Sequence, residues 1–354
     1  MFDFSNYNKI LLALFFIVFS PMALLTLYME PVSNELTRMG GYLENDFGWN
    51  EPQEHFEMPM FTLANDISEY DSYYDVVVFG DSFSEDLSHG WQNYFNQKTG
   101  LKIITFNMNQ VNIDSVLGSE IYQNNPPKIF VYQSVERNIV SRNQICLQNK
   151  QKLKNDYIKK IIEIDPHEIK IQYKMRNREK LSLGGLDLNS TINYLKKSFS
   201  RNVFGKNTTE VHNFSLKRKD LFSNKKSASL LVITRDFKLK DVTHEQIKVA
   251  QCSLLALQQR IRNNGRTEFI ALFFPDKTTT YSDFLIDERY AGMSVINNFE
   301  KIPKLNSTLL VDVFKNRVEQ GDVDFYLPND THCGFQAYKL AAEAVLARLH
   351  LSYK

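Results

Sequence analysis

The stretch YDVVVFGDSFS, residues 74–84, decides the fold. Its run of Val and Phe ends at a glycine, as expected for a buried strand of a parallel sheet where the strand meets a loop. The following Gly-Asp-Ser tripeptide then lies at the carboxyl end of that strand, the edge of an open α/β sheet at which ligands bind. We therefore expect a parallel sheet that exposes Ser82 at this edge.

Alternating strands and helices are predicted on either side of this stretch. Thr243 to Gln246 form a capping box for the longest helix, and Gly265 stands where its carboxyl cap belongs. The predicted strands cover residues 74–80, 101–107, 128–133, 268–274 and 308–313, and the predicted helices cover residues 84–95, 243–262, 287–300 and 334–349. This alternation predicts a single α/β domain with a parallel sheet and flanking helices.

The amino-terminal segment predicts one membrane helix. Residues 10–29 hold no charge over twenty positions, enough to span about 30 Å of hydrocarbon. A signal sequence is the alternative, but no convincing small-x-small cleavage site follows, so an uncleaved anchor is favoured. Lys9 before the segment and Glu30 after it favour an amino terminus on the inside. We expect a single-pass inner-membrane protein whose catalytic domain is periplasmic.

The chain divides into three predicted parts. Residues 1–30 form the anchor and residues 31–71 a stalk or lead-in, because Gly, Pro, Asn and acidic residues occur there without a clear period. Residues 72–354 form the catalytic domain, with an insertion at about 142–238, where Lys, Asn, Arg and Ser dominate.

Composition excludes several classes of function. The 42 Lys+Arg residues balance 41 Asp+Glu residues, which removes the electrostatic basis for binding nucleic acid. The three cysteines have no C-x-x-C spacing, and the carboxylates and histidines do not cluster at ligand spacing, so we expect no metal and no cofactor. Cys146 and Cys252 could form a disulfide, which the sequence leaves open.

A second motif, Asp330-Thr331-His332, supplies the partners that a serine nucleophile needs. A serine hydroxyl reacts only when a base takes its proton, and an imidazole base needs a carboxylate that orients it. The alternative is structural: Gly-Asp-Ser as a simple turn, Asp330 as a helix cap and His332 in solvent. Of the other six histidines only His167 has the same spacing, in Asp165-Pro166-His167, and it lies in the predicted insertion and not before a carboxyl-terminal helix. We predict Ser82 as nucleophile, His332 as base and Asp330 as its orienting carboxylate.

Together these two motifs resemble those of the SGNH (GDSL-type) hydrolase superfamily. Glu136-Arg137 after the third strand, and Pro275-Asp276-Lys277 with Tyr281 after a later one, look like the corresponding blocks of the AlgX/AlgJ-like exopolysaccharide O-acetyltransferases of the periplasm. The resemblance implies an SGNH-like fold and the transfer of an acetyl group to a polysaccharide. It also implies a site lined by Glu136, Arg137, Lys277 and Tyr281, although a surface ion pair and a turn would explain the same residues.

The resemblance further implies an oxyanion hole. The Ser82 backbone N–H is its expected first donor, and Asn112 and Gln133 are candidates for the others because they follow the second strand and end the third.

The leading hypothesis is therefore an O-acyltransferase in which an acyl-Ser82 intermediate passes its acyl group to a sugar hydroxyl. A membrane-bound O-acyltransferase partner would bring the acyl group across the membrane. One alternative is an SGNH-type esterase or deacetylase that passes the same intermediate to water. The other is an inactive polysaccharide-binding assembly protein.

Overall fold

The computed structural model describes residues 4–32, 34–64, 72–144, 146, 170–178, 188–290, 294–308 and 310–349. Its helices are α1 (Phe4–Tyr28), α2 (Glu35–Gly40), α3 (Glu44–Phe47), α4 (Trp91–Thr99), α5 (Ile113–Gly118), α6 (Glu120–Asn124), α7 (Glu136–Arg142), α8 (Leu188–Phe204), α9 (Thr234–Phe237), α10 (His244–Arg262), α11 (Lys277–Thr280), α12 (Asn297–Glu300), α13 (Leu310–Glu319) and α14 (Phe335–Arg348). Its strands are β1 (Gln53–Phe56), β2 (Thr62–Leu63), β3 (Val76–Gly80), β4 (Ile103–Asn107), β5 (Ile129–Val135), β6 (Ile171–Lys174), β7 (Val211–Ser215), β8 (Ser229–Ile233) and β9 (Glu268–Phe274). Short 3₁₀ turns lie at Ser82–Ser84, Lys238–Asp241, Ser282–Phe284 and Glu288–Tyr290.

A parallel sheet forms the centre of the molecule, as the sequence predicts, and its fifth strand is β2, from the segment expected to be a stalk or lead-in. Its strand order is β2-β4-β3-β5-β9, and every neighbouring pair is parallel. The chain passes from β3 to β4 on one side and then to β5 on the other. In open α/β sheets such a reversal opens a crevice at the carboxyl ends of the strands. Ser82 follows the end of β3 by two residues and therefore lies at this edge of the sheet.

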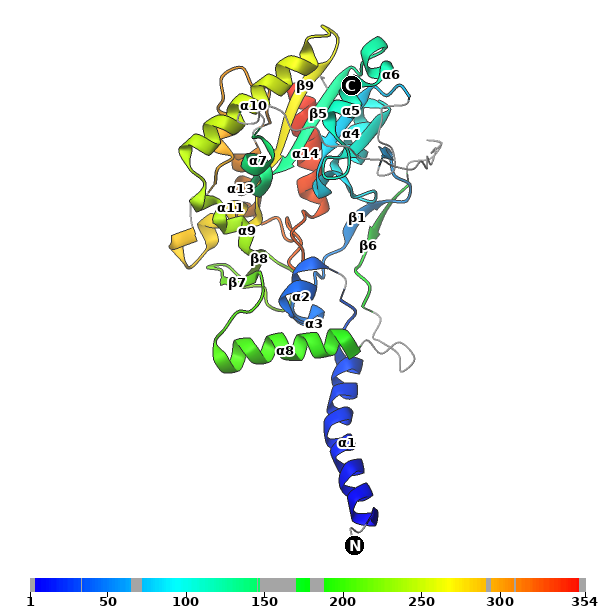
Figure 1. Ribbon diagram of the computed structural model, residues 1–354, viewed down its shortest axis with the longest axis vertical. Helices are drawn as coiled ribbons and strands as arrows, with labels where there is room; N and C mark the ends of the chain where they lie inside the picture. The colour runs from blue at the N-terminus through cyan, green and yellow to red at the C-terminus, as the bar shows by residue number, and fades with distance from the viewer. Residues whose placement is uncertain are drawn as a thin grey trace.

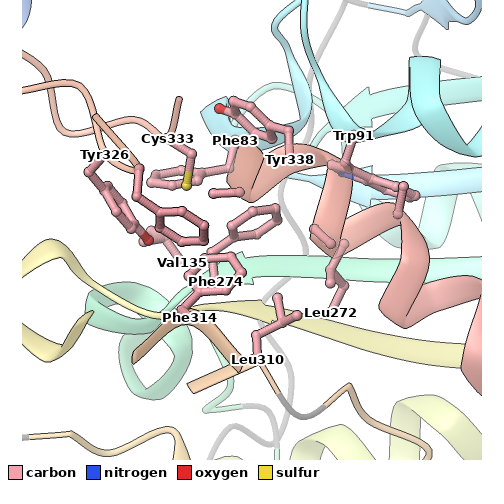
Figure 2. Packing of buried hydrophobic residues seen from close by; sticks show 14 of the residues in the cluster. Phe83, Trp91, Val135, Leu272, Phe274, Leu310, Phe314, Tyr326, Cys333 and Tyr338 are labelled. Atoms are coloured by element: carbon pink, nitrogen blue, oxygen red, sulfur yellow. The ribbon is translucent and has the colours of Figure 1, made fainter. Parts of the chain in front are cut away.

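Helices cover both faces of the sheet (Figure 1). Along β3, Val76 and Val78 point into the core shared with α4, α13 and α14, whereas Val77 and Phe79 point into the core shared with α5, α7 and α10. This alternation is the period of two expected of a strand, and both sets are apolar because both faces are buried. Figure 2 shows the first of these cores, in which Trp91, Phe274 and Tyr338 pack together.

Two expected elements are wrong. Residues 84–95 do not form one helix, because the Asp86 carboxylate accepts hydrogen bonds from the backbone N–H of Ser88 (2.8 Å) and of His89 (3.0 Å), and this turn delays α4 until Trp91. In the described part of residues 308–313, helix α13 begins at Leu310 where a strand is expected. Only Ser307 makes an isolated parallel bridge to the sheet, at Ala271.

The structure confirms two other expected helices, whose bounds differ from the expected ones by one residue at most. α10 begins after Thr243 with the predicted capping box, and α14 begins after Gly334. Within residues 287–300 only the turn Glu288–Tyr290 and the short helix α12 are helical in the described part.

The described part of the chain contains one helix long and apolar enough to cross a membrane, Tyr7–Tyr28 within α1. The chain does not leave this helix as a free connector. Asn45 accepts from the Glu30 backbone N–H (2.9 Å) and donates to the Tyr28 carbonyl (3.0 Å), while Arg176 pairs with Glu30. Residues 65–71 of the expected lead-in lie outside the described residues, but residues 34–64 carry α2, α3, β1 and β2.

The expected insertion at 142–238 packs against this amino-terminal segment. Strand β6 pairs antiparallel with β1, and β7 pairs antiparallel with β8. Leu36 of α2 and Phe47 of α3 share a small core with Val211, Leu231 and Ile233 of that hairpin. Helix α8 lies crosswise over the end of α1, at the boundary between α1 and the domain (Figure 1).

A disulfide joins Cys146 to Cys252, the pairing that the sequence leaves open. It ties the chain just after α7 to the middle of α10. The third cysteine, Cys333, is a free thiol.

Candidate active site

Ser82, His332 and Asp330 form a continuous hydrogen-bonded relay. His332 Nε2 lies 2.8 Å from Ser82 Oγ, and His332 Nδ1 lies 2.7 Å from Asp330 Oδ1. The same Asp330 oxygen accepts a hydrogen bond from the His332 backbone N–H at 3.1 Å, and this bond fixes the carboxylate beside the imidazole. The side chain of His332 remains 27% exposed and that of Asp330 14%, so the relay is open to a substrate. This is the arrangement that makes a serine hydroxyl nucleophilic.

The turn that carries Ser82, residues 80–84, is called the nucleophile turn. Gln133 of the neighbouring strand β5 supports it. This fully buried amide accepts from the Asp81 backbone N–H and from Ser84 Oγ, both at 2.9 Å, and donates to Asp81 Oδ1 at 2.9 Å. A Cβ at Gly80 would lie 2.7 Å from the Gln133 amide oxygen, so glycine is needed for this close approach. Gln133 therefore positions the turn with its amide oxygen and one N–H, and these contacts place it as a support of the turn instead of the oxyanion donor expected from the sequence.

Asp81 extends this support to the end of β5. Its second carboxylate oxygen accepts from the Val135 backbone N–H (2.9 Å) and from Arg142 Nη1 (2.6 Å). Because Asp81 is buried and fully hydrogen-bonded, it locks the residue before the nucleophile to the neighbouring strand.

The loop that carries Asp330 and His332, residues 327–333, is called the candidate catalytic loop, or catalytic loop for short. Lys277 binds its backbone. Tyr326 and Cys333 form an antiparallel bridge at its base. Lys277 Nζ donates to the carbonyls of Leu327 (2.7 Å), Pro328 (3.1 Å) and Asp330 (3.0 Å). Burial lowers the pKa of Lys277 to about 7, against the attraction of nearby carboxylates such as Asp330. Lys277 lies behind this loop and fixes its shape.

The charges around His332 favour its protonated form. Burial alone would lower the pKa of the imidazole, but the hydrogen bond and the charge of Asp330 outweigh burial and raise the pKa above 6.5. The nearby Arg137 guanidinium acts in the opposite direction, and the Glu35 carboxylate adds to the rise. A base that becomes a stabilised imidazolium is what proton abstraction from Ser82 requires.

Glu35 is a site residue that the sequence analysis missed. Its carboxylate accepts from Thr331 Oγ1 at 3.0 Å. Glu35, Asp330 and His332 each have one ligand-type atom within 4.8 Å of the others, the one group of this kind found in the described part of the chain. Both His332 ring nitrogens are engaged in the relay, so we interpret Glu35 as a second carboxylate that stabilises the imidazolium. A buried contact brings it there, since the Leu36 backbone N–H donates to the Asn329 carbonyl (3.0 Å).

Arg137 lies beside the nucleophile turn in a buried ionic cluster. Its guanidinium donates to Asp276 (2.5 Å) and Asp236 (3.3 Å) and lies 5.7 Å from the Phe83 ring. Burial raises the pKa of Asp236 to about 6 and that of Asp276 well above its usual value. The Arg137 guanidinium is therefore fixed by two carboxylates and lies near enough to His332 to lower the pKa of its imidazole.

Glu136 is structural. Its carboxylate, fully buried, accepts from the Asp276 backbone N–H (2.9 Å), from Ser294 Oγ (2.6 Å) and from the backbone N–H groups of Val295 (2.8 Å) and Ile296 (3.2 Å). It joins the ends of β5 and β9, and no side of it is open to a substrate.

Two more expected site residues have other roles. Tyr281 is fully buried, and its hydroxyl accepts the Tyr326 backbone N–H (3.2 Å), so it supports the catalytic loop from the core. Asn112 is exposed and uses its side-chain oxygen to cap α5 at the Asp114 N–H (2.9 Å). Asn107, which ends β4 beside Gly80, is the asparagine that the register brings to the nucleophile turn, where it contacts Glu85.

Cys333 is part of the core beneath the catalytic loop. Figure 2 shows its sulfur close to Phe83 and Tyr326, and it is fully buried. Burial raises the pKa of its thiol, so it stays protonated and unreactive at neutral pH.

Comparison of the chain with protein-family models, with curated proteins and with solved structures finds no match.

Proposed function

We propose that this protein is an extracytoplasmic serine O-acyltransferase, most simply an O-acetyltransferase, that modifies a polysaccharide. The observation that carries the proposal is the Ser82–His332–Asp330 relay, formed at the switch point of a parallel sheet. The alternative reading of these residues as a turn and a helix cap does not explain why two distant loops meet at a serine and a histidine.

The proposed reaction has two steps. Ser82 Oγ attacks the acyl carbonyl of a donor while His332 Nε2 takes its proton, and the imidazolium then protonates the departing group. The Ser82 backbone N–H, at the start of its 3₁₀ turn, is the first donor that we assign to the oxyanion. In the second step, His332 takes the proton of a sugar hydroxyl, whose oxygen attacks the acyl-Ser82 carbonyl. As the bond between Ser82 Oγ and the acyl carbon breaks, the His332 imidazolium returns this proton to Ser82 Oγ, which leaves the acylated sugar and the free enzyme.

Two features support an extracytoplasmic location. Helix α1 is long and apolar enough to cross a membrane, and the Cys146–Cys252 disulfide is of the kind that persists in oxidising compartments. Acetyl-CoA is not expected there, so the proposal includes a membrane-bound O-acyltransferase that supplies the acyl group and an anchor that keeps the enzyme beside it.

The experiment gives purified full-length protein p-nitrophenyl acetate as acyl donor and a panel of oligosaccharides as acceptors. Mass spectrometry of the sugars then separates the candidate functions. Acetylated sugar supports the transferase. Release of p-nitrophenol and acetate with unmodified sugar indicates the esterase, and no release above the Ser82→Ala background indicates an inactive assembly protein.

A further inference from the structure

The outward face of helix α8 is an apolar stripe that no element of the described chain covers. Its exposed members follow helical spacing along one side of the 17-residue helix: Ile192, Leu195, Phe199, Val203 and, at the end, Phe204. Phe199 and Val203 are each 58% exposed, unusually high for such side chains. A helix with one apolar face and one polar face of this kind is typical of a membrane interface.

The opposite face of α8 is bound to the domain. Lys197 Nζ donates to the Met39 carbonyl (2.7 Å), and Arg201 donates to the carbonyls of Gly40 and Gly41 (2.6 Å for the latter). These two cations therefore provide hydrogen-bond donors for the free carbonyl groups at the carboxyl end of α2. The outward direction of the stripe is thus fixed by the fold.

Helix α8 is also joined to the end of the candidate membrane helix. Thr26 Oγ1 and Thr191 Oγ1 lie 2.8 Å apart in a buried contact, and Thr191 contacts Met29. Figure 1 shows α8 crossing the end of α1 at this point, where a helix that spans a bilayer would leave the hydrocarbon. The stripe is therefore placed where a lipid surface would be.

We infer that α8 is an interfacial helix whose stripe inserts into the headgroup and acyl boundary of the outer leaflet of the membrane crossed by α1. The occupant of the stripe is lipid, because the contact with α1 fixes the depth of α8 and Lys196 and Lys206, which are also exposed, suit anionic headgroups. The inference rests on the proposed placement of α1 and does not depend on the acyl-transfer chemistry.

This arrangement would hold the relay near the membrane. The amino end of α2 binds the catalytic loop through Glu35 and Leu36, and its carboxyl end binds α8 through Lys197 and Arg201. Since α2 has six residues, a helix of about 9 Å separates the two sets of contacts. The catalytic loop then faces reactants delivered at the bilayer surface.

The test places one added tryptophan at a time in the full-length protein and reconstitutes it in vesicles with and without a brominated phosphatidylcholine, which quenches tryptophan in contact with acyl chains. Both native tryptophans, Trp49 and Trp91, are buried, so their emission is subtracted as background. The added positions are Phe199→Trp and Val203→Trp on the stripe, Phe16→Trp in α1, and Val313→Trp, an exposed apolar control on α13 far from α8 in Figure 1.

We expect brominated lipid to reduce the added emission at least twofold at Phe199→Trp, Val203→Trp and Phe16→Trp, and to leave Val313→Trp unchanged. Emission from both stripe positions that matches Val313→Trp would overturn the inference. So would blue-shifted but unquenched stripe emission, because a second protein copy would then cover the stripe. Loss of quenching at Phe16→Trp would overturn the placement of α1 and the inference with it, whereas the ester assay reports on the chemistry independently.

Discussion

Ser82 Oγ and His332 Nε2 lie 2.8 Å apart although the two residues are 250 positions apart in the chain. One follows the central strand of the sheet, and the other lies on a loop braced by Lys277 and by helix α2. Only the complete fold brings them together, which is why the predictions below treat the relay and its supports as one unit.

The members of the relay should not act independently. We expect Ser82→Ala and His332→Ala each to lower kcat on an activated acetate ester by about 10⁴-fold or more, and the double variant to be no worse than either. Asp330→Asn should cost roughly 10³- to 10⁴-fold, because the imidazole keeps its place but loses its orienting carboxylate. Steady-state kinetics on variants with unchanged thermal unfolding provide the measurement. Additive losses would show that the three residues do not share one step.

The position of Glu35 near His332 predicts that replacing Glu35 shifts the pH dependence of kcat/KM. His332 must be neutral to take a proton and its pKa is raised above 6.5, so kcat/KM should fall as pH drops through a value above 6.5. Glu35→Gln removes one charge that raises this pKa, so the acid limb should move to lower pH. The plateau should change by less than about fivefold, or about 1 kcal/mol. Asp220→Asn, at an exposed carboxylate paired with Arg218, is the matched control and should leave the profile in place. If the acid limb of the Glu35→Gln profile stays where it is in the wild type, Glu35 does not influence the pKa of His332.

Lys277→Met should loosen the catalytic loop. It removes the Lys277 donor from the Pro328 and Asp330 carbonyls and leaves the Leu327 carbonyl with only the Asp330 backbone N–H, and each buried unsatisfied group costs about 1–3 kcal/mol. We expect a clear fall in melting temperature and in kcat, with KM less affected. Lys128→Met is the control. It removes an ion pair between the exposed Lys128 and Asp75, so both the melting temperature and kcat should stay close to their wild-type values. Equal behaviour of the two variants would contradict the bracing role of Lys277.

The disulfide predicts a stability effect of reduction. Cys146 and Cys252 are 106 positions apart, and a crosslink of this kind typically contributes about 2–4 kcal/mol. Dithiothreitol should therefore lower the melting temperature by roughly 5–10 °C in the wild-type protein and have no effect on the double variant Cys146→Ser/Cys252→Ser. Equal sensitivity of the two proteins would mean that this pair is not bonded.

Local sequence signals account for most of the sheet. β3, β4, β5 and β9 are short apolar runs that end at turn residues, so their positions could be predicted one by one. Residues 308–313 show the limit of this approach. Leu310, Val311, Phe314 and Val318 are buried at helical spacing, but the first few residues alone cannot be told from a strand.

The supports of the site could not be predicted, because they depend on long-range packing. Glu35 lies in a segment without a periodic pattern and reaches His332 only because α2 packs on the loop that contains Asn329 and Thr331. Gln133 lies in β5, two residues before the strand ends at Val135, and which loop its amide supports depends on the register between β3 and β5. Asn107, by contrast, ends a predicted strand at the same edge as Ser82, and this position was the signal in the sequence that the choice of Asn112 overlooked.

The most direct test of the central claim compares Ser82→Ala with Ser88→Ala. Ser88 is a matched serine in the same loop, and its hydroxyl contacts Asp86 and His89 instead of the relay. Purified full-length proteins are treated with a serine-directed sulfonyl fluoride, mapped by mass spectrometry and assayed on p-nitrophenyl acetate. We predict that the label attaches to Ser82 in the wild type and in Ser88→Ala, and that Ser82→Ala loses both label and turnover while its unfolding curve is unchanged. A folded Ser82→Ala protein that is labelled or turns over the ester at the wild-type rate would contradict the assignment of Ser82 as the nucleophile.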